Sequence, residues 1–221
     1  MDIYQIAIDG PSGSGKSTLA KGVSKRLGIM YLDTGAMYRT CGLYALKNNV
    51  APKDEEKVTE LMNNMKLEVA FIDGNQHMIL DGEDVTSMIR TPEVSRYASD
   101  ISTLPVVRKK MVDMQREIAK AQSFVLDGRD IGSNVLPNAK YKFFLTASAE
   151  TRAERRLKEL NERGDFSQNY EEVLQDIINR DLQDSTRAAA PLKKVDDAIE
   201  IDTSKITIEE TLEALISKVN E

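Results

Sequence analysis

The stretch YQIAIDGPSGSGKSTLAKGV, residues 4–23, joins a short apolar run to a glycine-rich loop and then to a segment with helical character. Within it GPSGSGKS, residues 10–17, matches the pattern G-x-x-x-x-G-K-[ST] at every position. Small residues let successive backbone N–H groups turn inward around phosphate oxygens, and the start of the following helix adds its partial positive charge. The stretch therefore predicts a loop that binds the phosphates of a nucleotide.

The loop also suggests roles for two of its side chains. Lys16 is expected to bridge the β- and γ-phosphates as a catalytic residue, and the Ser17 hydroxyl is expected to ligate Mg²⁺. The expected cofactor is therefore Mg²⁺ bound together with ATP. The ATP-binding residues expected in this stretch are Gly10, Pro11, Ser12, Gly13, Ser14, Gly15, Lys16, Ser17 and Thr18.

Short apolar runs that alternate with helical stretches predict the fold class. The runs are almost continuously apolar, as is typical of parallel strands covered on both faces. Strands alternating with helices predict right-handed βαβ units, so we expect a three-layer α/β/α fold with a five-stranded parallel sheet. The strands are expected at residues 4–9, 29–33, 123–127, 141–146 and 198–202, and the helices at 16–27, 36–48, 105–121, 149–163 and 170–184.

One segment departs from this alternation. Residues 66–85 contain two alternating runs joined by Asp73-Gly74-Asn75, a sequence typical of a hairpin turn. We expect an antiparallel β-containing insertion at about 58–100 within a single domain covering residues 1–221. A polar segment near 160–172 predicts a mobile lid, which we place at about 157–172.

Composition limits the partners and the cellular compartment. A net charge of −6 argues against a nucleic-acid backbone as the main partner, and no apolar run approaches the roughly 18 residues of a membrane span. The single cysteine, Cys41, favours a reducing compartment, and the first ten residues do not resemble a secretory signal. We expect a cytoplasmic monomer that binds neither nucleic acid nor membrane.

A phosphate-binding loop alone does not distinguish a kinase from a GTPase switch or a motor ATPase. A GTPase should carry an Asn-Lys-x-Asp sequence that recognises guanine, and this sequence does not occur here. A motor ATPase usually follows its second acidic strand with Asp-Glu, whereas this chain has Asp127-Gly128. Both classes are therefore less favoured than a kinase.

Arginines near predicted strand ends and turns indicate a second anion site. In an α/β sheet, ligands bind beyond the carboxyl ends of the strands, which residues 33–39 and 127–132 would both reach. Forked guanidinium groups suit a phosphate held from several sides. The pattern predicts a phosphoryl transferase whose acceptor is itself phosphorylated. The arginines are Arg39, Arg108, Arg129, Arg180 and Arg187.

Some charged residues leave two interpretations open. Arg152, Arg155 and Arg156 have helical spacing with nearby glutamates, so they fit a solvated helix face as well as a phosphate site. From the lid helix, Arg152 and Arg156 are expected to reach the ATP phosphates. A role for Asp127 in binding Mg²⁺ through water competes with the same role for two other acids that end strands, Asp9 and Asp33.

Six motifs follow one another along nearly the whole chain: IDGPSGSGKST, YLDTGAMYR, LDGRDIG, KFFLTAS, ERRLKEL and RDLQDSTRAAAPL. Their order and spacing together resemble the bacterial cytidylate (CMP) kinase family. The resemblance implies transfer of the γ-phosphoryl group of MgATP to CMP or dCMP, which gives CDP or dCDP and ADP. A kinase of the same fold acting on UMP or on a non-nucleotide acceptor remains an alternative, as does a nucleotide-dependent switch ATPase.

The same resemblance implies roles for the residues of the acceptor site. Asp130 would accept a hydrogen bond from the cytosine amine and Arg108 would donate to the ring, a pairing that uracil would not satisfy. Because the attacking phosphate oxygen is already an anion, no general base is expected. Thr34 stands where the family often has serine and keeps the hydroxyl. The implied groups are Arg39, Arg129 and Arg187 for the CMP phosphate, the last two also as catalytic residues, Arg180 and Asp184 for the ribose, and Ser99, Arg108 and Asp130 for the base.

Overall fold

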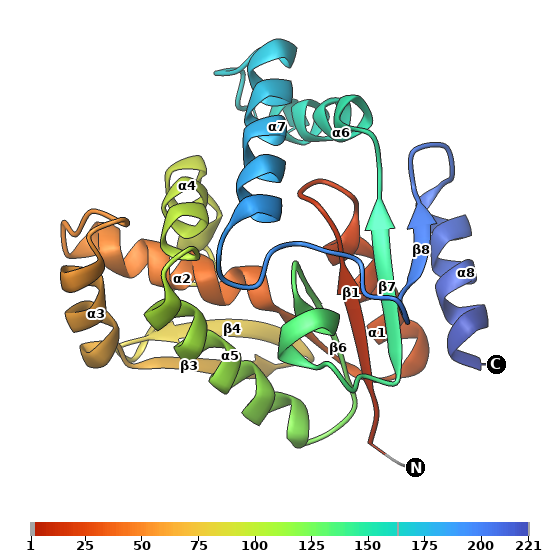
Figure 1. Ribbon diagram of the computed structural model, residues 1–221, viewed down its shortest axis with the longest axis horizontal. Coiled ribbons are helices and arrows are strands. Elements are labelled where there is room, and N and C mark those ends of the chain that lie inside the picture. Colours follow the sequence, from red (N-terminus) through yellow and green to blue (C-terminus); the bar gives the residue numbers. More distant parts are fainter. Residues whose placement is uncertain (1–2, 163, 221) are drawn as a thin grey trace. The chain divides into compact units, whose positions relative to one another are not determined.

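The computed structural model describes residues 3–162 and 164–220 (Figure 1). Residue 163, inside the expected lid, and the outermost residues of the expected domain lie outside the described part of the chain. The chain divides into two compact units, one formed by Met1–Ile29 with Phe124–Glu221 and the other by Met30–Ser123. The insertion expected at about 58–100 falls wholly within the second unit.

A parallel sheet with strand order β2-β6-β1-β7-β8 is the centre of the fold and confirms the expected class. β1 lies between β6 and β7, in a register that pairs Ile8 with Asp127 and with Phe143. Ile6, Ala7 and Ile8 are completely buried, as continuous apolar strands require. The strands are β1 (Gln5–Asp9), β2 (Met30–Asp33), β6 (Phe124–Gly128), β7 (Tyr141–Thr146) and β8 (Ile199–Asp202).

The loop between β1 and the first helix of the first unit depends on glycine. Gly10, Gly13 and Gly15 all have positive φ angles, of 149°, 76° and 88°. A Cβ on Gly10 would lie 2.1 Å from the carbonyl oxygen of Leu145, so a side chain cannot fit there. The helices of this unit are α1 (Lys16–Leu27), α6 (Ala149–Glu162), α7 (Tyr170–Thr186) and α8 (Ile208–Asn220).

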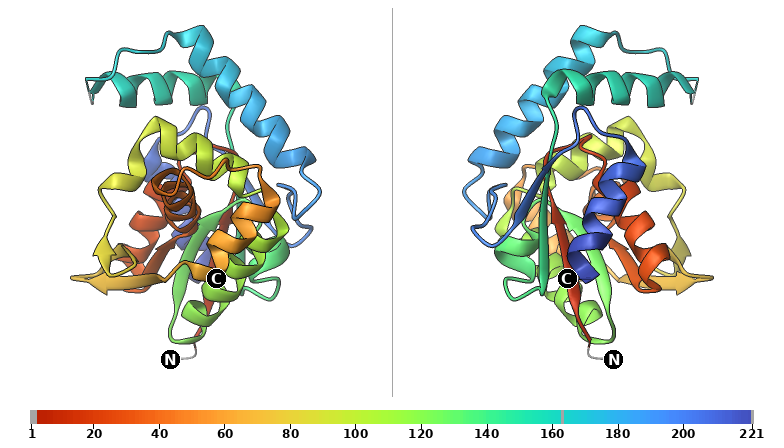
Figure 2. Two further views of the ribbon diagram at one scale, coloured as in Figure 1. Left: turned by 90° about the vertical axis from the view of Figure 1, so that its left-hand side faces the viewer. Right: turned by 90° about the vertical axis from the view of Figure 1, so that its right-hand side faces the viewer.

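Helices α6 and α7 form a hairpin that stands beyond the carboxyl end of β7 (Figure 2). The hairpin has a small apolar core of its own, made by Ala153 and Leu160 from α6 and Val173 and Ile177 from α7. Asn169 begins α7 with a reciprocal capping box to Glu172. These local signals explain why the lid segment is two helices joined by a short loop.

The second unit contains the hairpin that the sequence predicted. β3 and β4 are antiparallel, and Asp73 and Gly74 at the turn have φ angles of 51° and 75°, as the favoured two-residue turn requires. α4 packs against α2, where a Cβ on Gly42 would lie 2.8 Å from the backbone nitrogen of Ala98. The other elements of this unit are α2 (Thr34–Lys47), α3 (Glu55–Asn64), β3 (Leu67–Ile72), β4 (Asn75–Leu80), β5 (Glu83–Asp84), η1 (Met88–Arg90), α4 (Pro92–Ile101) and α5 (Pro105–Lys120).

Candidate active site

The phosphate-binding loop lies between β1 and α1, and Lys16, Ser17 and Thr18 are the first residues of α1. The Lys16 ammonium is buried and donates to the Pro11 carbonyl at 2.6 Å and to Ser14 Oγ at 3.4 Å. Burial lowers the pKa of Lys16 well below its ordinary value; the charge of Arg129 lowers it further, while Asp127 acts in the opposite direction. A phosphate anion at the loop would favour the charged form again.

Ser17, in the first turn of α1, and Asp127, near the carboxyl end of β6, bring two oxygen-bearing side chains together. Ser17 Oγ donates to Asp127 Oδ2 at 2.8 Å, and Asp127 is buried. A hydroxyl and a carboxylate suit a hard cation such as Mg²⁺. Within residues 3–162 and 164–220, no group of three or more His, Cys, Asp or Glu side chains is suited to hold a metal ion alone. The donor set therefore fits a cation that is also bound by nucleotide phosphates.

The two acids that competed with Asp127 are both engaged elsewhere. The Asp9 carboxylate accepts from the backbone N–H groups of Ile131 at 2.8 Å and Gly132 at 2.7 Å. Burial raises the pKa of Asp9 to about 6 despite these two hydrogen bonds. Asp33 caps α2 by accepting from Ala36 N at 2.8 Å. Asp127 is thus the acid of the three that contacts Ser17.

Four of the predicted acceptor residues form one buried network in the first unit. Arg129 Nε donates to Asp184 Oδ2 at 2.8 Å, and Arg187 lies 3.3 Å from Asp130 Oδ1 and 3.8 Å from Asp184 Oδ1. Burial favours the neutral form of Arg129, but Asp184, Asp127 and Asp181 together outweigh it and raise the pKa of the guanidinium. Burial would raise the pKa of Asp184, but Arg129 and then Arg180 lower it. The network joins the end of β6 to the end of α7.

Asp130 owes its position to an unusual turn after β6. The backbone N–H of Val135 donates to the Asp130 carbonyl at 3.1 Å and that of Leu136 to Ile131 at 2.7 Å, which makes η2 (Ile131–Val135) a single π-type turn. Asn134 from this turn donates to Asp130 Oδ2 at 2.9 Å. Sequence reasoning did not predict η2 or the role of Asn134.

Arg180, on α7, belongs to the first unit, and the remaining predicted acceptor residues lie in the second unit. Arg39 Nη2 donates to Asp33 Oδ2 at 2.8 Å, and its buried Nε has no hydrogen-bond partner among the described residues. Thr34, the first residue of α2, is buried. Arg108 is also buried; it lies over the Tyr38 ring at 5.7 Å and donates to the Ser102 carbonyl at 3.3 Å.

Ser99 lies in the second unit, near the end of α4 and next to the turn that leads into α5. Its carbonyl accepts from Ser102 Oγ at 2.8 Å, and Ser102 is also the residue that Arg108 contacts. Tyr38, on α2, was not identified from the sequence. Its ring connects the helix that carries Arg39 to the helix that carries Arg108.

The two lid arginines differ in their surroundings. Arg152 is buried, and its guanidinium makes two hydrogen bonds to Asp181, at 3.0 and 2.6 Å, and a third to the Ser12 carbonyl at 3.1 Å. Arg156 is partly exposed and pairs with Glu159 at 3.3 Å. Arg152 therefore contacts the phosphate-binding loop, whereas Arg156 pairs with a residue of its own helix. Asp181 was not identified from the sequence.

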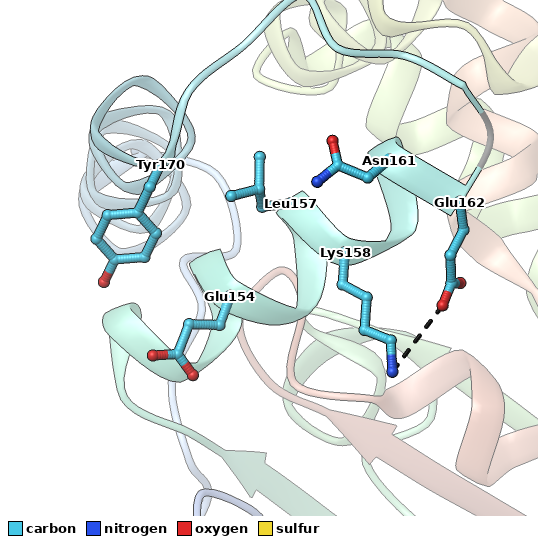
Figure 3. Close-up of a pocket in the computed structure, with 6 residues that line it drawn as sticks. All are labelled: Glu154, Leu157, Lys158, Asn161, Glu162 and Tyr170. Atoms are coloured by element: carbon cyan, nitrogen blue, oxygen red, sulfur yellow. Dashed lines mark ion pairs between the residues drawn. The ribbon is translucent and has the colours of Figure 1, made fainter.

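A pocket of about 540 Å³ lies on the α6–α7 hairpin, apart from these groups (Figure 3). None of the residues predicted for either substrate lines it, and its charged groups include the Lys158–Glu162 pair at 3.9 Å. This pocket is therefore not part of the candidate active site, which consists of the residues described above. The lining residues are Glu154, Leu157, Lys158, Asn161, Glu162 and Tyr170.

The parallel sheet, the phosphate-binding loop after its central strand and the antiparallel insertion define the chain as a P-loop kinase by fold. Solved structures with this fold include a gluconokinase from Sinorhizobium meliloti, with a TM-score of 0.52, 13% identity and coverage of 98% of this chain and 92% of that one. A shikimate kinase from Bacteroides thetaiotaomicron has a TM-score of 0.50 at 12% identity, with 100% of both chains covered. At such low identity these structures establish the fold alone.

Sequence comparison identifies the family. The cytidylate kinase family model matches residues 6–221. A cytidylate kinase from Thermosipho melanesiensis is 52% identical over 98% of this chain and 97% of its own, and one from Caldicellulosiruptor bescii is 50% identical over 98% and 95%. The chain belongs to the cytidylate kinase family, which confirms the resemblance and makes the protein a kinase enzyme.

No helix in the described part of the chain is long and apolar enough to cross a membrane.

Proposed function

We propose that the protein transfers the γ-phosphoryl group of ATP, bound with Mg²⁺, to CMP or dCMP, releasing ADP and CDP or dCDP. The observation that carries this proposal is the family match over residues 6–221. The buried network of Arg129, Asp130, Asp184 and Arg187 supports it, because such a network suits a small anionic acceptor. The protein acts as a cytoplasmic monomer without nucleic-acid or membrane partners, in keeping with its net charge and single cysteine.

The donor nucleotide binds at the loop that precedes α1. Backbone N–H groups of residues 10–18 surround the phosphates, and Lys16 spans the β- and γ-phosphates. Ser17 and, through water, Asp127 would hold Mg²⁺, which neutralises phosphate charge when bound. Arg152 and Arg156 reach the transferring phosphate from α6, the helix that leads into the lid. The lid, residues 157–172, closes over ATP and excludes water.

The acceptor nucleotide is held by arginines at its phosphate and by an acid at its base. Arg39, Arg129 and Arg187 bind the CMP phosphate; the unpartnered Nε of Arg39 is a buried donor suited to this role. The attacking phosphate oxygen needs no base, so its alignment and the neutralisation of its charge are the main catalytic tasks. Arg180 and Asp184 contact the ribose, Ser99, Arg108 and Asp130 contact the cytosine, and Thr34 offers its hydroxyl beside the acceptor.

A panel of acceptors tests this function. ADP release should be fastest with CMP and dCMP and much slower with UMP, AMP and shikimate. A protein that used AMP as well as CMP would overturn the cytidylate assignment, and hydrolysis that only a macromolecule stimulates would favour a switch ATPase. Asp130→Asn should lose more discrimination between CMP and UMP than affinity for ATP, whereas Asp113→Asn, at an exposed acid on α5, should change neither.

A further inference from the structure

Gln76 on β4 makes an unusual pair of hydrogen bonds to one backbone residue of β2. The Asp33 N–H donates to Gln76 Oε1 at 2.6 Å, and Gln76 Nε2 donates back to the Asp33 carbonyl at 3.1 Å. The two residues are 43 positions apart in the chain and belong to the same compact unit, Met30–Ser123. Nε2 also lies 3.1 Å from Met78 Sδ.

The chemistry of a strand edge explains why a carboxamide suits this position. β2 is the outermost strand at one side of the sheet, so part of its backbone has no neighbouring strand to bond. A glutamine side chain carries one acceptor and one pair of donors in a plane, much as a peptide group does. Gln76 therefore replaces one residue of a missing neighbouring strand at Asp33.

Asp33 is the residue that fixes the start of α2. Its Oδ1 caps the helix through Ala36 N, and its Oδ2 accepts from Arg39 at 2.8 Å and lies 3.7 Å from Arg90. Thr34, the next residue, is the first of the helix. A shift of the Asp33 peptide would accordingly displace both the helix start and the partner of Arg39.

We propose that Gln76 is a positioning residue for the acceptor nucleotide: it holds the Asp33 peptide in place and so sets where α2 presents Thr34 and Arg39. This inference rests on the proposed function, in which both residues bind CMP. Gln76 touches neither substrate in this assignment and acts through Asp33. In this proposal the hairpin that carries Gln76 also positions residues of the acceptor site.

A pair of substitutions with a matched control tests this role. Gln76→Glu keeps the size and the acceptor but loses the donor and places a negative charge beside the Asp33 carbonyl and carboxylate; it should raise the KM for CMP about tenfold. Gln76→Met removes both hydrogen bonds without adding charge and should raise that KM about threefold. In both variants the KM for ATP should stay within about twofold, because the phosphate-binding loop belongs to the other unit.

The control is Asn75→Asp, the same change from amide to acid one residue away at an exposed position. A KM for CMP that stays unchanged in both Gln76 variants, rises as much in the control, or rises in parallel with the KM for ATP would overturn the proposal. If Gln76→Glu does not fold, Gln76→Met gives the answer.

A substrate-free measurement separates this inference from the proposed function. Amide hydrogen exchange at Asp33 should be slow in the wild type and about tenfold or more faster in Gln76→Met, whatever the enzyme phosphorylates. Equal exchange rates at Asp33 in the two proteins would show that Gln76 does not protect this amide, and would overturn the proposal. The protein could also fail to phosphorylate CMP while Gln76→Met still speeds exchange at Asp33. That result would refute the acceptor assignment but support the contact between Gln76 and Asp33.

Discussion

Lys16 is the residue on which the donor half of the site depends. Its ammonium is buried against the Pro11 carbonyl and the Ser14 hydroxyl. Residues 10–18 contain no other cationic side chain that could take its place. Lys16→Ala should lower kcat about a thousandfold while the Kd for CMP, measured by calorimetry, stays within about threefold. Lys21→Ala, at an exposed position of the same helix, serves as the control. Turnover that survived the loss of Lys16 would contradict its assignment.

Asp9 gives the protein a pH dependence of known sign. Its pKa is about 6 in the folded state against 3.8 ordinarily, so between these values the folded protein binds more protons than the unfolded chain. The free energy of unfolding therefore falls as pH rises through this window, by about 3 kcal/mol for this group. The stabilising contribution is complete below pH 3.8 and lost above about 6.

Denaturant unfolding of Asp9→Asn at several pH values measures that contribution. Because asparagine does not titrate, the stability of the variant relative to the wild type should improve steadily from pH 4 to pH 7. Parallel pH profiles for the two proteins would show that Asp9 titrates normally. The N–H groups of Ile131 and Gly132 each donate to a different Asp9 oxygen, which gives a reason to keep a carboxylate here, since the amide nitrogen of an asparagine only donates and could not accept either bond.

At the scale of elements, local sequence signals predicted most of the fold. The strand, loop and helix formed by residues 5–27 follow from a motif whose glycines adopt the positive φ angles that the loop requires. The hairpin of β3 and β4 was predicted from the turn residues Asp73 and Gly74, which have positive φ angles. Helices α3 and α4 were missed although Asp54 and Thr91 cap them, because each is only 10 residues long and its apolar face is short. Helix α8 was also missed.

The contacts within the site were harder to predict because they join distant parts of the chain. Arg152 reaches Asp181, 29 positions away, and Gln76 reaches Asp33 across 43. Neither spacing matches a helix or a strand period, so no local pattern could reveal either pair. The contact of Asp127 with Ser17 became visible only once the sheet register had placed Asp127 beside the strand that leads into the phosphate-binding loop, and its role in binding Mg²⁺ stays a prediction.

The pair of Arg152 and Asp181 ties α6 to α7 and to the loop. Because the Arg152 guanidinium is buried, Asp181→Asn leaves its charge poorly compensated and should destabilise the protein by about 2–3 kcal/mol. The KM for ATP should rise as well, since the same guanidinium donates to Ser12. Asp176→Asn, on the same helix with Gln168 as an exposed partner, is the matched control. Equal thermal unfolding of the two variants would contradict this role.

At the scale of the whole molecule, the residues assigned to CMP are divided between the two compact units. Thr34, Arg39 and Arg108 belong to Met30–Ser123, whereas Arg129 and Arg187 belong to the unit that holds the phosphate-binding loop. The chain passes from one unit to the other at residues 29–30 and returns at 123–124. No property of the sequence marks these two points, because neither is a polar or proline-rich linker.

This division makes ligand-linked stability a test of the complete acceptor assignment. CMP at about one hundred times its Kd should stabilise the folded protein by about 2.7 kcal/mol, which corresponds to a Tm increase of about 5–10 °C for a chain of this size. Arg39→Ala and Arg129→Ala, one in each unit, should each abolish most of that increase. Both should keep the increase that MgATP produces, because neither residue is assigned to ATP.

Arg96→Ala, at an exposed position of α4, controls for the loss of an arginine as such and should retain both responses. If only Arg129→Ala lost the response to CMP, the acceptor would be bound by the first unit alone, and the roles assigned to Arg39 and its neighbours would be wrong. Loss of the MgATP response in Arg39→Ala would instead mean that this residue supports the whole fold. Loss of the CMP response in both variants, with the MgATP response unaffected, is the result expected if Arg39 and Arg129 both bind CMP.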